Sequence, residues 1–206
     1  VEIDFVLKRR PCASKTVRFL GISAAQIHHL NPPDLIDVVY NAVKPQTFRF
    51  QSTPAQSSPY LAFLGRLTQN KGVDLAISVA RAAGIPLKIA GNVPKNPADQ
   101  QFFETVVKPE LGNGCEWVGT VNDQQKNDFL GQAQALLFPI QWDEPFGIVM
   151  AESLACGTPV IATRRASTPE VIDHGRTGFL CNSADEMIKA VCQIRTLDRQ
   201  IGRAHV

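Results

Sequence analysis

From Pro59 onward, short apolar runs alternate with stretches whose apolar residues recur at helical spacing, and this alternation constrains the fold more than any other feature. The runs are rich in aliphatic and aromatic residues, which is typical of parallel strands that are buried on both faces. The runs that we predict as strands are Tyr60–Leu64, Leu87–Ala90, Cys115–Val118, Ala135–Phe138, Pro159–Ala162 and Gly178–Leu180.

The segments between these runs predict helices, and several carry recognisable end signals. Pro97 suits a first helical turn, Ser183 suits an N-cap, and Gly157 followed by Pro159 is a stop pattern. Repeated strand–helix units in one chain predict a Rossmann-like α/β fold, a doubly wound parallel sheet with right-handed crossovers. The predicted helices cover residues 72–83, 97–107, 123–132, 146–155 and 184–194.

The amino-acid composition of the chain changes upstream of this region. Residues 42–58 are rich in Pro, Gln and Ser and are interpreted as an exposed linker between domains. Residues 1–41 are too few to form their own core, so we interpret them as the remnant of a preceding α/β domain, with 59–206 as the main domain. The predicted upstream elements are strands at Val17–Gly21 and Asp37–Tyr40 and a helix at Ala24–Leu30 capped by Ser23.

Composition excludes several classes of protein. The formal net charge of +2 over 206 residues offers no case for bulk nucleic-acid binding, and the basic run 8–10 is interpreted as a solvated turn. No apolar stretch is long enough to span a membrane, although contact with a membrane surface stays open. The five cysteines are widely spaced without a CxxC pair, which argues against a disulfide framework or structural zinc and fits a cytoplasmic location.

Ligands of doubly wound folds bind at the carboxyl ends of the strands, so the loops there are the candidate site. In the first, after Tyr60–Leu64, Gly65 lets the chain leave the sheet, and Arg66 and Lys71 flank the next helix. A helix N-terminus and two cations suit an anion such as a pyrophosphate. Solvated surface cations are the alternative interpretation of this loop.

The second loop, after Ala135–Phe138, carries two carboxylates. Glu144 stands at the entrance of a helix, and Glu152 lies two turns into it among apolar residues, where a buried carboxylate needs a partner. Carboxylates accept hydrogen bonds from vicinal hydroxyls, so each could hold one sugar ring. The amides of Phe146, Gly147 and Ile148 face the same space. The alternative for Glu144 is a charge that favours the helix dipole.

The third loop, after Pro159–Ala162, is less specific. Ser167 and Thr168 are predicted to cap the helix that begins near Pro169, and Arg164 and Arg165 are either ligand-facing or solvated.

Isolated aromatic and histidine residues add little to these loops. Trp117 follows a strand pattern and is predicted to lie in the core, whereas for Trp142 core packing and ligand contact are weighed evenly. No metal-ligand spacing links His28, His29, His174 or His205, so no metal site is predicted.

Four segments in order resemble retaining glycosyltransferases of family four, which have the two-domain GT-B architecture. They are FLGRLTQNKGVDLAI (63–77), WVGTVND (117–123), FPIQWDEPFGIVMAESLACGTPVIAT (138–163) and PEVIDHGRTGFL (169–180). GISAAQ (21–26) and VVYNAV (38–43) resemble the end of the family's acceptor domain. The resemblance implies that this chain is mainly the nucleotide-sugar-binding half of a GT-B enzyme.

The resemblance also implies a role for individual residues. Arg66 and Lys71 match the pair that binds the donor diphosphate, Glu144 the glutamate on the donor sugar, and Glu152 the glutamate on the nucleotide ribose. The donor-binding set further includes Gly65, the loop amides of Phe146, Gly147, Ile148 and Val149, and the base-side edge at Thr120 and Val121. The resemblance implies no cofactor and no metal, because cations and amides offset the charge on the leaving diphosphate.

We therefore expect a hexosyltransferase-like enzyme that transfers a sugar from a UDP, GDP or ADP sugar to the hydroxyl of a saccharide, lipid or small molecule. The chain alone is expected to transfer little, because most of the acceptor domain is absent from it. Two residues depart from the family pattern, since Ala166 and Ala42 stand where the family has Gly. The Ala166 departure and the missing acceptor domain favour a non-catalytic nucleotide-sugar-binding module as an alternative. A nucleotide-sugar epimerase of the same architecture is the other alternative.

Overall fold

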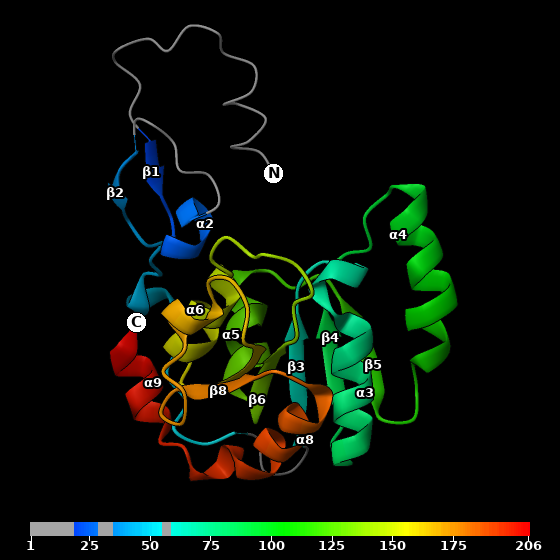
Figure 1. Ribbon diagram of the computed structural model, residues 1–206. Coiled ribbons are helices and arrows are strands. Elements are labelled where there is room, and N and C mark those ends of the chain that lie inside the picture. The colour runs from blue at the N-terminus through cyan, green and yellow to red at the C-terminus, as the bar shows by residue number, and fades with distance from the viewer. Residues whose placement is uncertain (1–18, 29–34, 55–58) are drawn as a thin grey trace, which may run out of the picture.

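The computed structural model describes residues 19–28, 35–54 and 59–206, and its centre is a six-stranded parallel sheet (Figure 1). The strand order is β5-β4-β3-β6-β7-β8. The chain therefore starts in the middle of the sheet and winds outward first in one direction and then in the other, which confirms the predicted doubly wound fold. The strands are β3 Leu61–Leu64, β4 Leu87–Ala90, β5 Cys115–Gly119, β6 Ala135–Phe138, β7 Val160–Thr163 and β8 Gly178–Cys181.

Helices cover both faces of this sheet. Alternate residues of β3 face opposite sides, so that Leu61 and Phe63 join one buried cluster with α3 and α8, while Ala62 joins another with α5 and α6. Figure 1 shows α3 and α8 on one side of the strands. The helices are α3 Val73–Ala83, α4 Pro97–Phe102, α5 Asp123–Gly131, α6 Ile148–Ala155, α7 Thr168–Val171, α8 Ala184–Gln193 and α9 Arg199–His205.

Most of the predicted end signals act as expected. The Ser183 side chain accepts a hydrogen bond from the Glu186 amide at 3.2 Å, and Pro97 lies in the first turn of α4. The predicted helix 97–107 changes pitch instead of continuing. After Phe102 it widens into a π-helix over Phe103–Val107 and then tightens into a 3-10 turn over Lys108–Glu110. Pro109 lies in that turn and has no amide hydrogen to give to a regular α-helix, which accounts for the change.

Trp117 corrects a prediction, because it lies at the surface and not in the core. It belongs to β5, the edge strand, and is 37% exposed. Its indole Nε1 donates to the carbonyl of Gly91 at 2.9 Å, and its ring meets Phe103 edge-on at 4.9 Å. A strand pattern does not tell an edge strand from a central one, and only Cys115 of β5 is buried.

A small second sheet precedes the main one and lies outside it (Figure 1). It pairs β1 Phe19–Gly21 with β2 Leu35–Val38 in parallel, and α2 Ala24–His28 lies between them in the chain. β2 begins two residues before the predicted strand 37–40, and predicted residues 17, 18, 29 and 30 lie outside the described residues. The predicted Ser23 cap is confirmed, since its hydroxyl accepts from the Gln26 amide at 3.0 Å.

Residues 46, 47, 49, 52 and 53 of the predicted linker are exposed, as expected, but the segment is also bound to the helices of the main sheet, which the sequence did not indicate. A 3-10 turn at Pro45–Thr47 leads to Phe48, which packs against the core. The Gln51 amide donates to the Cys156 carbonyl at 3.0 Å, and the Arg49 amide to Asn127 Oδ1 at 2.7 Å. Residues 55–58 lie outside the described residues.

Arg199, at the start of α9, forms hydrogen bonds with the segments that precede the strands. Its guanidinium, in a residue only 8% exposed, donates to the carbonyls of Gln51, Ala133 and Gly131 and to Thr158 Oγ1, at 2.6–2.9 Å. Burial lowers the pKa of Arg199 to about 10. The pattern of apolar residues in the sequence did not indicate these hydrogen bonds of Arg199.

Four cysteines fall within the described residues, and all four are free: Cys115, Cys156 and Cys181 are buried, and Cys192 is exposed. None of the helices in the described ranges is both long and apolar enough to cross a membrane.

Candidate functional site

The three candidate loops follow β3, β6 and β7, which are neighbours in the sheet, so the fold brings them to one edge. The first two touch closely. A Cβ placed on Gly72 would lie 1.9 Å from the Pro139 carbonyl oxygen, so only glycine fits at that crossing. The Gln141 amide also donates to the Asn70 carbonyl at 2.9 Å. This contact places the end of the first loop against the second.

Lys71 and Glu144, predicted from separate loops, form an ion pair at this contact. Both side chains are largely buried, with 16% and 11% of their surface exposed. The Trp142 indole Nε1 donates to the same Glu144 oxygen at 2.9 Å, and Lys71 Nζ lies 5.0 Å from the centre of that indole ring. The half-buried Trp142 therefore packs against the core and contacts two predicted site residues at once.

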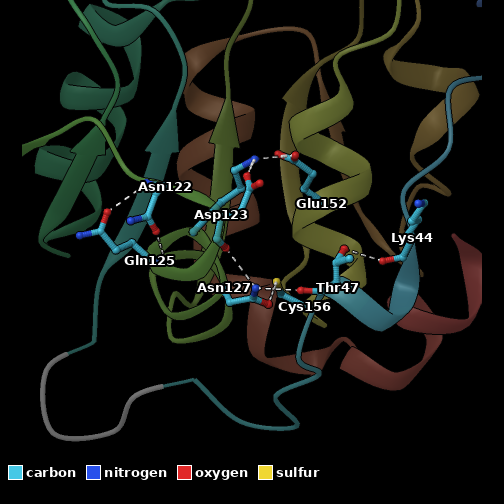
Figure 2. A network of polar contacts seen from close by, with 9 residues as sticks. Lys44, Thr47, Asn122, Asp123, Gln125, Asn127, Glu152 and Cys156 are labelled. Carbon is cyan, nitrogen blue, oxygen red and sulfur yellow. Dashed lines mark hydrogen bonds and ion pairs between the residues drawn. The ribbon is translucent and has the colours of Figure 1, made fainter.

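Glu152, which is labelled in Figure 2, has the partner that its burial requires, and that partner is Lys126. Lys126 Nζ donates to Glu152 Oε1 at 2.7 Å, with side chains 18% and 13% exposed. Burial alone lowers the pKa of Lys126, but the hydrogen bond and charge of Glu152 and the charge of Asp123 outweigh it and raise the pKa. The prediction missed Lys126, which lies on another helix, and no spacing in the sequence connects it with Glu152.

The amides before and in α6 are arranged as an open helix N-terminus. α6 begins at Ile148, two residues later than predicted, because Gly147 is its N-cap in the left-handed conformation with φ 74°. No side chain caps the first turn, so the amides of Ile148 and Val149 are unclaimed by any described side chain. The Phe146 ring is buried beneath the loop. The dipole and the uncapped amides make this turn suited to an anion or a hydroxyl oxygen.

Arg66 takes no part in the Lys71–Glu144 ion pair. It is exposed and lines a polar hollow with Thr68, Gln69, Asn70, Asp99 and Gln141. Gly65 does not have to be glycine for lack of space, since an added Cβ would meet only the Phe63 ring at 3.9 Å. The residue that must be glycine here is Gly91, because a Cβ added to it would lie 1.7 Å from the Gly65 carbonyl oxygen.

Thr120 and Val121 connect β5 to α5 on the side of Lys126. Thr120 is exposed and Val121 packs partly against the core. The next residue, Asn122, forms a capping box with Gln125, in which each side chain accepts from the other's amide at 2.9 and 3.0 Å. The turn that carries Lys126 is thereby fixed.

The third loop departs from its prediction. Ser167 precedes α7 but does not cap it; its hydroxyl donates to the Glu144 carbonyl at 2.8 Å. Thr168 Oγ1 accepts from the Arg165 amide at 3.0 Å and donates to the Thr163 carbonyl at 2.6 Å. These hydroxyls were predicted to serve the helix, but they hold the loop to Glu144 and to β7.

Arg165 and Ala166 complete this loop. Arg165 Nε donates to Asp143 Oδ1 at 2.8 Å, which joins the second and third loops. Ala166 is left-handed at φ 49°, a conformation that disfavours any residue with a Cβ. The backbone at Ala166 therefore has a conformation that glycine adopts more readily than alanine.

Glu170 holds the upstream unit. Its two carboxylate oxygens accept from the amides of Ala24 and Ala25 at 2.7 and 2.8 Å, at the start of α2. The carboxylate also raises the pKa of Tyr40 through a hydrogen bond. Glu170 thus caps a helix that is far away in the sequence, whereas the sequence pattern placed Glu170 only in the third loop.

No cluster of three or more His, Cys, Asp and Glu side chains suited to a metal is found over the described ranges. His174 has a different engagement, since its Nδ1 accepts from the Leu180 amide at 3.0 Å. His29 lies outside the described residues.

A doubly wound parallel sheet with paired lysines and carboxylates at the carboxyl ends of its strands is the architecture of a nucleotide- or phosphate-binding α/β protein. Comparison with protein families narrows this class. The chain belongs to the group 1 glycosyl transferases, whose family model matches residues 45–198.

Individual relatives and structures agree with this assignment. The gpi3 subunit of phosphatidylinositol N-acetylglucosaminyltransferase from Schizosaccharomyces pombe is 30% identical over 92% of this chain and 42% of its own length. Alpha-maltose-1-phosphate synthase from Mycolicibacterium smegmatis is 32% identical over 59% of this chain and 33% of its own. The chain thus spans less than half the length of these relatives.

Solved structures show the same fold. AviGT4, a glycosyltransferase involved in avilamycin A biosynthesis, is similar with a TM-score of 0.73 and 25% identity, over 90% of this chain and 57% of that one. HepE from Anabaena, solved with UDP-glucose, is similar with a TM-score of 0.71 and 17% identity, over 91% of this chain and 57% of that one. At that identity the second likeness concerns the GT-B fold alone.

Proposed function

We propose that this chain is mainly the donor-binding part of a retaining glycosyltransferase, which moves a sugar from a nucleotide-diphosphate sugar to an acceptor hydroxyl. The observation that carries the proposal is the pairing of both predicted carboxylates with lysines around the uncapped start of α6. A sugar nucleotide offers hydroxyls and a diphosphate, and this edge of the sheet offers acceptors, cations and free amides at short range.

The roles divide along the ligand. Lys71 and the exposed Arg66 bind the diphosphate, and Lys71 can do so while it still touches Glu144 because an ammonium has three donors. Glu144 accepts from hydroxyls of the donor sugar, and Glu152 from hydroxyls of the ribose. The family membership and the UDP-glucose in the HepE structure support a nucleotide sugar as the ligand.

In the reaction, the bond from the anomeric carbon to the diphosphate oxygen breaks, and the acceptor oxygen bonds to that carbon on the same face. The acceptor proton passes to the leaving phosphate. Charge grows on the diphosphate in this step, and Arg66, Lys71 and the α6 amides stabilise it as fixed positive groups. We propose that these groups serve in place of a metal ion.

The proposal is tested by calorimetry of the chain with UDP-, GDP- and ADP-glucose and with the free nucleotides. We expect one nucleotide series to bind and the other two to bind at least tenfold more weakly, a preference of about 1.4 kcal/mol. Absence of binding in all three series would exclude the proposal. Release of a sugar epimer without any acceptor would favour the epimerase alternative, and binding without transfer by the full-length protein would favour the non-catalytic module.

A further inference from the structure

The ribose-side carboxylate does not act alone: we propose that Lys126 is a positioning residue that holds Glu152 for the vicinal hydroxyls of a ribose. The inference rests on the proposed function, since it assumes that Glu152 faces the nucleotide. Lys126 binds one carboxylate oxygen, Oε1, at 2.7 Å. In the described part of the chain Oε2 has no hydrogen-bond partner, so one oxygen is fixed and the other is available to a hydroxyl.

The location of Lys126 is unfavourable on structural grounds alone. It is the fourth residue of α5, near the helix end whose dipole repels a cation, and its side chain is only 18% exposed. Asp123, its other acidic contact, lies 3.4 Å away but is fully exposed at 100%, so that contact is weak. Glu152 is therefore the group that accounts for a buried cation at this place.

The turn that carries Lys126 is held from several sides (Figure 2). The Asn122–Gln125 capping box fixes its start. The next residue, Asn127, donates to the Thr47 carbonyl at 3.0 Å and to the Asp123 carbonyl at 3.2 Å. A lysine on such an anchored turn holds its partner in one orientation, which is what directional hydrogen bonds to a diol require.

The charge of the site supports the same role. A donor diphosphate is an anion, and two unpaired carboxylates nearby would repel it. Lys71 offsets Glu144, and Lys126 offsets Glu152. Lys126 therefore lets a carboxylate accept from the ribose hydroxyls without adding net negative charge beside the diphosphate.

The test compares Lys126→Met with wild type for the nucleoside diphosphate that the wild-type chain prefers and for its 2′-deoxy and 3′-deoxy forms. We expect Lys126→Met to weaken binding of the ribonucleotide about tenfold while the deoxy forms change by less than about threefold. The preference for ribose over deoxyribose then falls. Lys126→Arg keeps the charge and a donor, and should restore most of the preference.

Lys108→Met is the matched control, because Lys108 forms an ion pair with Glu104 on an exposed surface, where both side chains are more than half exposed. It should leave all three affinities unchanged. If Lys126→Met weakens the ribonucleotide and the deoxy forms equally, or changes neither, Lys126 does not position Glu152 and the inference is overturned. If the methionine variant does not fold, Lys126→Gln is used to measure the same ratio of ribonucleotide affinity to deoxynucleotide affinity. A wild-type chain that binds no nucleotide overturns the proposed function itself, which distinguishes the two failures.

Discussion

The two ends of the six-stranded sheet hold buried cations in opposite ways. At the carboxyl ends, Lys71 and Lys126 each pair with a carboxylate and remain partly exposed. At the amino ends, Arg199 is more deeply buried and donates to four neutral oxygens, with no carboxylate partner among the described residues. A partly exposed ion pair can bind a ligand's hydroxyls or phosphates, whereas a buried guanidinium that already makes four hydrogen bonds has little left to offer a ligand. The first arrangement suits binding and the second suits folding.

The sharpest way to break this comparison is to remove Arg199. We expect Arg199→Met to lower the free energy of unfolding by about 3 kcal/mol or more, because it leaves several buried carbonyls without donors. Urea unfolding measures this loss. Lys126→Met, at the other end, should cost less than Arg199→Met, because it leaves one carboxylate oxygen without its donor, whereas Arg199→Met leaves four oxygens without theirs. A larger loss from Lys126→Met than from Arg199→Met would contradict the division.

The amino end should also weaken selectively at alkaline pH. Burial raises the pKa of Cys156 to about 11 and that of Tyr60 to about 12, and both lie near Arg199. The folded chain thus keeps protons that the unfolded chain has lost. Stability from the thiol is complete below about pH 9 and declines as the pH rises to about 11, by up to about 1.4 kcal/mol per pH unit.

Urea unfolding at a series of pH values between about 8 and 10 checks this sign, because above about pH 10 the lowered pKa of Arg199 acts in the opposite direction. Cys156→Ala should flatten the decline. Cys192→Ala is the matched control, since Cys192 is exposed, and it should leave the slope unchanged. Stability that rises with pH over this window would show that the thiol is not held protonated by the fold.

At the carboxyl end, substitutions of Glu144 and Glu152 should have different effects on the binding of free nucleotide and similar effects on the binding of nucleotide sugar. We expect Glu152→Ala to weaken binding of the free nucleoside diphosphate about tenfold, and Glu144→Ala to weaken it less, because the proposed roles assign only Glu152 to the ribose. With the nucleotide sugar, both variants should lose affinity. Calorimetry measures each constant, with Glu104→Ala as a surface control. Equal affinity of wild type and Glu152→Ala for free nucleotide would refute the ribose role.

The smallest predicted effect concerns strain beside the site. Ala166→Gly should raise the free energy of unfolding by about 0.5–1 kcal/mol, because glycine adopts a positive φ without penalty. Asn113→Gly is the control: Asn113 has φ 47°, but asparagine tolerates the left-handed region better, so its gain should be smaller. A loss of stability in Ala166→Gly, measured by thermal unfolding, would show that Ala166 is not strained.

The sequence predicted the strands, their parallel direction and the edge of the sheet that carries the loops, because buried parallel strands have a pattern that depends only on nearby residues. Trp117 was predicted wrongly since local pattern carries no information about which strand lies at an edge. The docking of the linker on α5 and α9 is invisible for the same reason. Its hydrogen bonds, such as Gln51 to Cys156, join residues far apart in the chain.

The candidate site divides similarly. Glu144 and Lys71 were selected from their own loops, and the structure brings them into contact. That Glu152 needs a partner followed from its apolar surroundings, but the identity of Lys126 did not, because partner choice depends on how α5 and α6 pack. The roles of these residues toward a ligand stay predictions until binding is measured.

The carboxylate of Glu170 connects α2 with the loop that carries Glu144. It grips the two leading amides of α2, and three residues earlier in the chain the Ser167 hydroxyl is bonded to the Glu144 carbonyl. α2 and Glu144 are therefore linked through one short segment of backbone. A displacement of the upstream unit would therefore be transmitted through that segment to the backbone of Glu144, so the geometry of the Lys71–Glu144 pair depends on where α2 lies.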